Sequence, residues 1–289
     1  MFLRYYAMGV PDALIALGII TFWIALLWKT LNLITKFDDN KELGSKNNVA
    51  YALQRIGLVS AQVLAMLAAM SDFDSSHRLA SATWMMIEGA WIMAALLLSR
   101  AIVDWIVLPK INNTSLLLEG NIAIGIVEAG AYIGLGYLLA GSLTGSASSN
   151  WLSFTSSVVF YALGVALVAG VFWLHELVTP YSLRDRLKEG SVTAGLETGG
   201  LLLATSVVTS VGVAGDFIGW WIGIRAFLAT SAISIVLLYP GWIILNRFGP
   251  GQRERDTQKQ EGNVAAAAVS TSFLVLAGFL VASVVQTLL

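Results

Sequence analysis

The chain contains no cysteine, and only two of its 289 residues are histidine. The missing cysteine excludes disulfide bonds and thiolate chemistry, and two histidines are too few for a histidine-based metal site. Charged residues make up 12% of the chain, whereas soluble domains carry about 25%. This scarcity excludes an ordinary soluble domain, and the net charge of −1 gives no indication of nucleic acid binding.

Hydrophobic residues, by contrast, make up 57% of the chain. A helix that spans the bilayer core needs about 20 apolar residues, and eight stretches meet this condition. They cover roughly 12–35, 48–70, 79–108, 121–143, 152–178, 191–214, 217–244 and 263–289. The sequence therefore predicts an all-α, polytopic membrane protein in the lipid bilayer, with eight transmembrane helices.

A short motif recurs along the chain at a nearly constant spacing. It reads EGN at 119–121, EGS at 189–191 and EGN at 261–263, with a degenerate copy around Asn48. The anchors Asn48, Asn121, Ser191 and Asn263 follow one another after 73, 70 and 72 residues. A fixed period indicates one structural unit used several times, here four two-helix hairpins, all parallel. Such repeats suit a ring or bundle around the membrane normal. We expect two tandem domains of two hairpins each, 1–148 and 149–289.

The positive charges predict the orientation in the membrane. All Lys and Arg residues except Arg4, Arg78 and Arg225 lie in or beside the polar loops 38–47, 111–120, 181–190 and 253–262. Cytoplasmic loops are rich in Lys and Arg. We therefore expect these loops to be cytoplasmic and both termini to lie outside, in a bacterial inner membrane.

The repeated motif has two interpretations. The glutamates Glu119, Glu189 and Glu261 could form a cytoplasmic ring that gathers cations. Alternatively, Asn48, Asn121, Ser191 and Asn263 cap helices by accepting a free backbone N–H, with glycines permitting the sharp entry. The capping motif would comprise these four residues with Glu119, Gly120, Glu189, Gly190, Glu261 and Gly262. We favour capping, because the first repeat has Lys46 and Asn47 where the others have Glu and Gly.

Small residues follow the anchors in helical register, among them Gly125, Gly130, Gly195 and Gly199. Small residues let helices approach closely in lipid. We therefore expect the second helix of each hairpin to form the packed interior or the interface of a homo-oligomer, most simply a dimer.

Ionisable residues inside the predicted spans are the main candidates for function, because a charge in the bilayer is costly. Arg55 and Glu128 each lie seven residues after their anchor, and Glu197 lies six residues after its own. The three should share one depth. They either form a structural Arg–carboxylate cluster or line an ion or proton path, and the sequence leaves both open. Glu88 and Arg225 are secondary intramembrane charges toward the other side.

Acidic loops that run into Glu-Gly-Asn and then an Ala/Gly-rich helix resemble the YjfL-type bacterial inner-membrane proteins, a domain of unknown function (family 350). The matching residues include Glu119, Gly120, Asn121 and Gly130, while Ser191 and the first repeat depart from the pattern. The resemblance implies two tandem copies in a multi-pass membrane protein. It also implies an association with envelope-stress systems, and it supplies no catalytic residue.

Two functional hypotheses follow. The first is a channel-like or transporter-like protein for a small ion, with Arg55, Glu128 and Glu197 lining the path. The second is a membrane scaffold that recruits a soluble cytoplasmic partner through loops 38–47, 181–190 and 253–262. No hydrolase, kinase or dinucleotide motif is present, so we expect neither an enzyme nor a cofactor or metal.

Overall fold

The computed structural model describes residues 9–35, 38–104, 111–179, 182–248 and 263–288. Eight helices in this part of the chain are long and apolar enough to cross a membrane. They are Val10–Thr35 (α1), Val49–Ser71 (α2), Arg78–Ile102 (α3), Ile122–Ser142 (α5), Asn150–Val178 (α6), Val192–Val213 (α8), Trp220–Asn246 (α9) and Val264–Leu288 (α11). The predicted all-α membrane fold is confirmed.

Short helices lie in the polar connections between the two spans of a hairpin. They are a π-helix at Asn40–Ser45 (η1), α4 at Asn113–Leu118 and α7 at Leu183–Lys188, while a 3-10 turn at Ser75–His77 (η2) precedes α3. The sequence predicted polar loops at these places. Asn112 and Ser182 cap α4 and α7, so each of these loops forms a helix of six residues before it reaches the next span.

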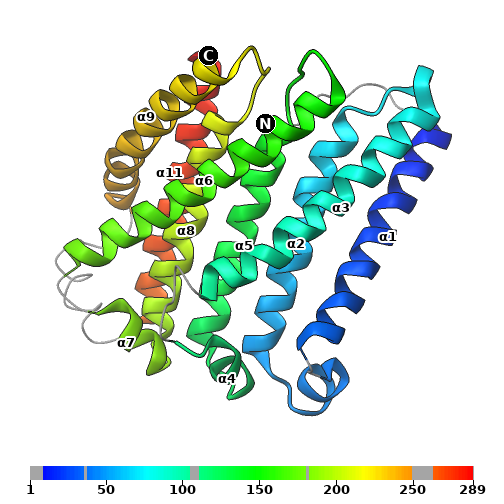
Figure 1. The fold of residues 1–289 in the computed structure, drawn as a ribbon. Helices are drawn as coiled ribbons and strands as arrows, with labels where there is room; N and C mark the ends of the chain where they lie inside the picture. The colour runs from blue at the N-terminus through cyan, green and yellow to red at the C-terminus, as the bar shows by residue number, and fades with distance from the viewer. Residues whose placement is uncertain (1–8, 36–37, 105–110, 180–181, 249–262, 289) are drawn as a thin grey trace.

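The second helices of the four hairpins form a row. α2 packs against α5, α5 against α8, and α8 against α11, and all four begin at the same end of the molecule (Figure 1). Across the row, Phe279 of α11 contacts Tyr137 of α5 with ring centroids 5.4 Å apart. The sequence left a ring or a bundle open, and the second helices that the structure describes form an open row.

Glycines allow the backbones of the row to touch. A Cβ atom on Gly130 of α5 would lie 2.4 Å from the carbonyl oxygen of Gly199 in α8. A Cβ on Gly125 would lie 2.6 Å from the carbonyl oxygen of Ala50 in α2. Real Cβ atoms do not approach so closely, so only glycine fits here. The row therefore has a sealed interior of small residues, because close backbone packing replaces the hydrophobic drive that lipid does not supply.

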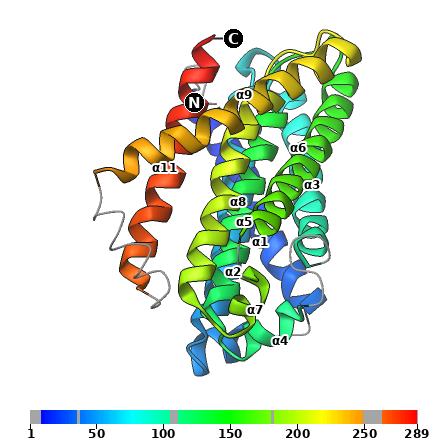
Figure 2. The ribbon, with the colours of Figure 1, turned by 90° about the vertical axis from the view of Figure 1, so that its left-hand side faces the viewer.

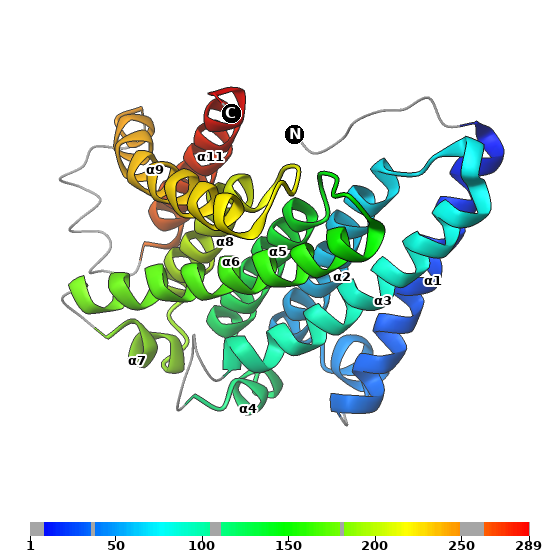
Figure 3. The ribbon, with the colours of Figure 1, turned by 45° about the horizontal axis from the view of Figure 1, so that its top comes forward.

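The first helices of the hairpins lie against this row. α3 packs on α2 and α5, α6 on α5 and α8, and α9 on α8 and α11, while α1 packs on α2 and α3. Figures 2 and 3 show α3, α6 and α9 inclined to the helices of the row. In every hairpin the first helix is less buried than the second. Side chains that point from the second helix toward its own first helix are thus enclosed between two layers.

Candidate functional site: intramembrane charges between the two helix layers

The second helices share one kind of N-terminus. Each cap side chain accepts a hydrogen bond from the backbone N–H three residues later, at 3.0 to 3.4 Å. The four caps are Asn48, Asn121, Ser191 and Asn263. Such a bond satisfies one of the free backbone donors at a helix start. The caps also give the helices a common origin, from which positions in different repeats can be compared.

The residues before the caps have the backbone geometry that the motif requires. Gly120 has φ +82° and Gly190 has φ +83°, and Asn47 takes the same place in the first repeat with φ +50°. Glycine adopts this left-handed conformation without steric cost. Glu119 and Glu189 are exposed. Glu261 and Gly262 lie outside the described residues.

Two of the three asparagine caps make a second contact that the sequence did not predict. Asn48 Nδ2 donates to the carbonyl oxygen of Leu117 at 2.8 Å, and Asn121 Nδ2 donates to that of Leu187 at 2.9 Å. Each bond joins the cap of one hairpin to the short helix of the next hairpin. Ser191 has no amide with which to make this bond. Asn in place of Ser at a cap was therefore the feature of the sequence that could have indicated this bond.

Arg55 is buried, with 1% of its surface exposed, and it is held by polar groups of its own hairpin. Its Nη2 donates to Asp39 Oδ1 at 2.9 Å and to Asn32 Oδ1 at 3.0 Å. Its Nε donates to the hydroxyl of Tyr51 at 2.9 Å. Its Nη1 has no hydrogen-bond partner in the described part of the chain. The charge of Arg55 is therefore matched by the carboxylate of Asp39, which lies in the loop before η1.

Aromatic rings complete the surroundings of Arg55. The guanidinium carbon lies 4.8 Å from the ring centroid of Tyr51 and 5.7 Å from that of Trp28. Both rings lie within the range of cation–π attraction, which strengthens where water is excluded. Asp39 and Tyr51 were not among the predicted site residues, because their nearness to Arg55 depends on how α1 returns to α2.

Glu128 of α5 is fully buried and has a different environment. Its Oε2 accepts a hydrogen bond from Gln54 Nε2 of α2 at 2.6 Å and one from the Tyr132 hydroxyl at 3.2 Å. Its Oε1 is buried and has no hydrogen-bond partner in the described part of the chain. The charged groups that act on it are Asp104 and Arg100, at the end of α3. Glu128 thus lies among neutral partners, with one oxygen left open.

The structure does not join the three predicted residues into one cluster. Arg55 takes its partners from α1, α2 and the loop before η1, and Glu128 takes its partners from α2 and α5. Glu197 lies on α8 and is half-buried. No hydrogen bond or ion pair between these three residues is found in the described ranges. They share a depth along the helices but lie in successive hairpins.

The secondary charges Glu88 and Arg225 also lie apart. Glu88 is half-buried on α3, where the charge of Asp72 acts on it. Arg225 is exposed on α9, with its guanidinium carbon 5.8 Å from the ring centroid of Trp221. The helices α3 and α9 lie at opposite ends of the molecule (Figure 1). An ion pair that the sequence did not predict joins the buried Asp12 to Arg78, whose side chain is 48% exposed.

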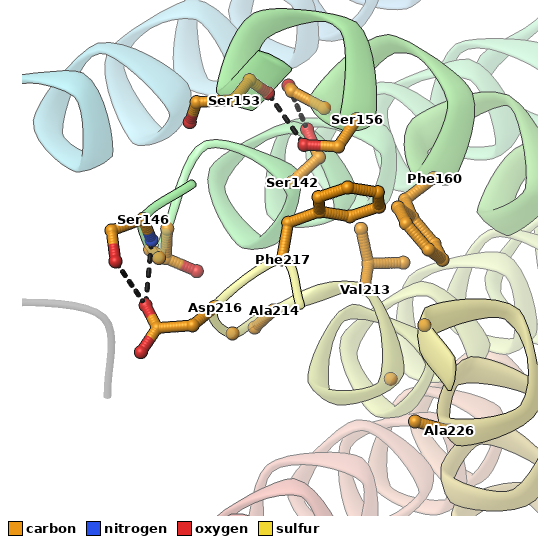
Figure 4. A pocket seen from close by; sticks show the side chains of 16 residues that line it. Ser142, Ser146, Ser153, Ser156, Phe160, Val213, Ala214, Asp216, Phe217 and Ala226 are labelled. Carbon is orange, nitrogen blue, oxygen red and sulfur yellow. Dashed lines mark hydrogen bonds between the residues drawn. The ribbon is translucent and has the colours of Figure 1, made fainter. Parts of the chain in front are cut away.

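A serine-rich crevice of about 80 Å³ lies at the end of the molecule opposite the caps. Figure 4 shows Ser146 against Asp216, whose Oδ1 accepts bonds from the Ser146 backbone N–H at 2.7 Å and hydroxyl at 2.9 Å. Phe217 N donates to the Ser146 carbonyl at 2.8 Å. Ser146 and Asp216 are 70 residues apart, which is the local repeat spacing. The crevice thus lies where the connections that follow α5 and α8 meet.

Comparisons with known proteins agree with the repeat. A family model described as Domain of Unknown Function (DUF350) matches residues 5–143, 77–213 and 149–285. Successive windows begin 72 residues apart, and each covers two hairpins. The resemblance to this domain of unknown function, predicted from the Glu-Gly-Asn motif, is confirmed. The division into 1–148 and 149–289 stays a prediction, since the middle window crosses that boundary.

A relative from Aquifex aeolicus (strain VF5), called UPF0719 transmembrane protein, is 23% identical to the chain over 195 residues. The match covers 67% of this chain and 72% of the relative. No solved structure matches the chain. Together with the eight apolar helices, these findings establish a multi-pass membrane protein.

Proposed function

We propose that this chain, which belongs to the family described as Domain of Unknown Function (DUF350), carries a small cation across the membrane through its first two hairpins. Glu128 is the residue that binds the cation within the bilayer. Gln54 and Tyr132 hold its carboxylate in place. The proposal keeps the ion-transport hypothesis drawn from the sequence and transfers its centre from a three-residue cluster to one carboxylate.

The observation that carries the proposal is the open oxygen of Glu128. A buried carboxylate without full hydrogen bonding is costly, by several kcal/mol even after relaxation, and membrane proteins keep such residues mainly where ions or protons pass. Glu128 is 0% exposed, and its Oε1 has no partner in the described ranges. A positive ion at this oxygen would remove that cost.

Other polar groups near the interfaces of α2, α3 and α5 support a path in both directions. Toward the caps, Asp104 and Arg100 act electrostatically on Glu128. Toward the opposite end, Gln62 of α2 is fully buried, and neither of its side-chain polar atoms has a partner in the described part of the chain. Glu88 and Asp72 follow toward that end. Polar groups thus occur at several depths along these three helices.

Arg55 has a structural role in this proposal. Its charge is already matched by Asp39 and by two aromatic rings, so a passing cation gains nothing there. Arg55 fixes the end of α1 and the loop before η1 against α2. The ion path therefore passes Glu128 in the second hairpin. Arg55, at the equivalent position of the first hairpin, holds the helices and the loop together and does not line the path.

Ion flux into liposomes tests this function. The protein is reconstituted with a pH-sensitive or a sodium-sensitive dye inside the vesicles, and flux is started by an ion gradient. We expect Glu128→Gln to abolish the flux of the wild type. Glu119→Gln, in the exposed loop of the same hairpin, should leave it unchanged. Equal flux with Glu128→Gln and wild type, or no flux with any common cation, would exclude the proposal.

A scaffold remains the second candidate, and the sealed row favours it. Backbone contacts such as Gly130 with Gly199 make the row a rigid support, and the bonds from Asn48 and Asn121 hold the inner loops in fixed positions. In this alternative the loops bind a soluble envelope-stress partner. Charge reversal at Lys41 and Lys188 should then abolish recovery of that partner in pull-downs from membranes, while Glu128→Gln should not affect it.

The orientation and location belong to the same proposal. We place the caps in the cytoplasm of a bacterial inner membrane and both termini outside, because Lys and Arg gather near the caps. Since the chain has no cysteine, single cysteines report the topology without background. Ser148→Cys should react with an impermeant maleimide on intact cells, and Glu189→Cys should react only after permeabilisation. The reverse pattern would overturn the assignment. The homo-oligomer and the absence of enzymatic activity also stay predictions.

A further inference from the structure

We infer that the cation bound by Glu128 is a proton, and that it binds at Oε1. The inference rests on the proposed function in one respect: it takes Glu128 as the residue that binds the cargo. It adds the chemical class of that cargo, which the open oxygen alone does not decide.

The groups that touch Glu128 suit a proton better than a metal ion. Metal cations such as Ca²⁺ and Mg²⁺ bind six or more oxygen atoms, and K⁺ is held by rings of carbonyl oxygens. The two partners of Glu128 instead direct an amide N–H and a phenol O–H at its Oε2, at 2.6 and 3.2 Å. Hydrogen-bond donors occupy the places that further oxygen ligands would need. The carboxylate is therefore prepared for a proton, which needs one oxygen only.

The two hydrogen bonds to Oε2 also serve both protonation states of Glu128. With a proton on Oε1, Oε2 is a carbonyl oxygen that accepts the bonds from Gln54 and Tyr132. Without the proton, Oε2 accepts the same two bonds as part of a carboxylate. An amide and a phenol remain neutral in both cases. The proton can therefore arrive and leave at Oε1 without breaking either bond.

The charged groups around Glu128 act in opposite directions. Arg100 and Asp104 act on it from the end of α3, and its hydrogen-bond partners on α2 and α5 are the uncharged Gln54 and Tyr132. A positive and a negative group at the same helix end partly cancel. Neither charge state of Glu128 is locked in place by an ion pair, in contrast to Arg55 and Asp39. This balance is what reversible proton binding requires.

Infrared difference spectroscopy on the purified full chain tests the inference without relying on transport. The carbonyl band of a protonated carboxylic acid that is present in the wild type and missing in Glu128→Gln reports the protonation of Glu128. We expect this band to titrate with pH, with the same midpoint in sodium, potassium and choline chloride. A midpoint that falls as sodium or potassium increases, or a band that never appears while the protein stays folded, would overturn the inference.

A second variant keeps the test specific for the site. Gln54→Leu removes one donor from the ionised carboxylate, and hydrogen bonds to charged groups contribute enough to change proton affinity by about one to two pH units. We therefore expect the midpoint to rise by that amount, and an unchanged midpoint would contradict the assigned contact. If the band titrates as expected but liposomes show no flux, the proton site stands and the transport proposal fails. If Glu128-dependent flux is carried by sodium or potassium, the transport proposal stands and the inference that the cargo is a proton is wrong.

Discussion

Arg55 and Glu128 occupy the same position in successive hairpins, seven residues after the caps Asn48 and Asn121. Both are buried, at 1% and 0% exposed. Arg55 has a carboxylate partner, three further polar partners and two aromatic rings. Glu128 has two neutral partners and an open oxygen. The same place in the repeat thus holds a compensated charge in one hairpin and an incompletely compensated one in the next.

The difference separates structural charges from functional candidates. A buried ion pair with good geometry is stable but inert, because neither member can release its partner without a large cost. A buried carboxylate with neutral partners can change its charge state at a smaller cost. In the proposed function, Arg55 therefore stabilises the fold and Glu128 binds the ion. Measurements on the two positions can break this assignment.

The largest effect is expected at Arg55. Arg55→Met leaves the carboxylate of Asp39 without its partner, and breaking a buried pair costs about 3–5 kcal/mol. Thermal or chemical unfolding in detergent should show this loss in the free energy of unfolding. The double variant Arg55→Met with Asp39→Asn should recover part of it. A loss below about 1 kcal/mol for the single variant would mean that the Arg55–Asp39 pair contributes no more than an ordinary surface ion pair. The contrast between Arg55 and Glu128 would then be wrong.

A smaller effect is expected at the cap that defines the equivalence of the two positions. Asn121→Ala removes a capping bond, which contributes about 1 kcal/mol, and the bond to Leu187, which contributes a further ~0.5–1.5 kcal/mol. Asn121→Ser keeps a capping oxygen, as Ser191 does in the next hairpin, and should lose only the second part. Equal unfolding free energies for the two variants would show that the inter-hairpin bond adds nothing.

Glu128→Gln should change stability less than either. The amide fills the same volume and removes an uncompensated buried charge, so we expect the free energy of unfolding to stay within about 1 kcal/mol of the wild type. Unfolding in the same detergent provides the comparison. If Glu128→Gln destabilised the chain as much as Arg55→Met, Glu128 would also be a structural residue. The distinction between a structural Arg55 and a functional Glu128 would then be wrong.

The smallest effect is expected at an exposed pair, which serves as a reference for the buried one. Hydrogen bonds from His77 and Ser76 lower the pKa of Asp74 to about 2, and its carboxyl is exposed. Because the pKa is lower in the folded chain, the ionised carboxyl stabilises the fold at pH values above its pKa in the unfolded chain, which is about 3.9. This contribution is lost as the pH falls toward 2. Asp74→Asn should therefore reduce stability slightly at pH 6 and not at pH 2, as unfolding at both pH values would show. A larger loss at pH 2 than at pH 6 would contradict this sign.

Much of the candidate site could be predicted from the sequence because it depends on distance along a helix. The spacing from the caps placed Arg55 and Glu128 at one depth, and the apolar stretches placed both inside the bilayer. The partners could not be predicted. Asp39 reaches Arg55 only because the chain turns back before α2, and Gln54 reaches Glu128 only because α2 packs on α5 through Gly125 and Ala50.

The sequence by itself determined the membrane class, the repeat and the depth of each intramembrane charge, because hydrophobic length and helical rise are local properties. Only the tertiary structure decided which charges meet. In a ring, equivalent residues would converge on one axis. In the observed row, Arg55 faces α1 of its own hairpin, and Glu128 lies near the end of α3 of its own. Equivalent positions are therefore separated by one repeat. Arg55 takes its partners from its own hairpin, whereas Glu128 takes Gln54 from the preceding hairpin and Tyr132 from its own.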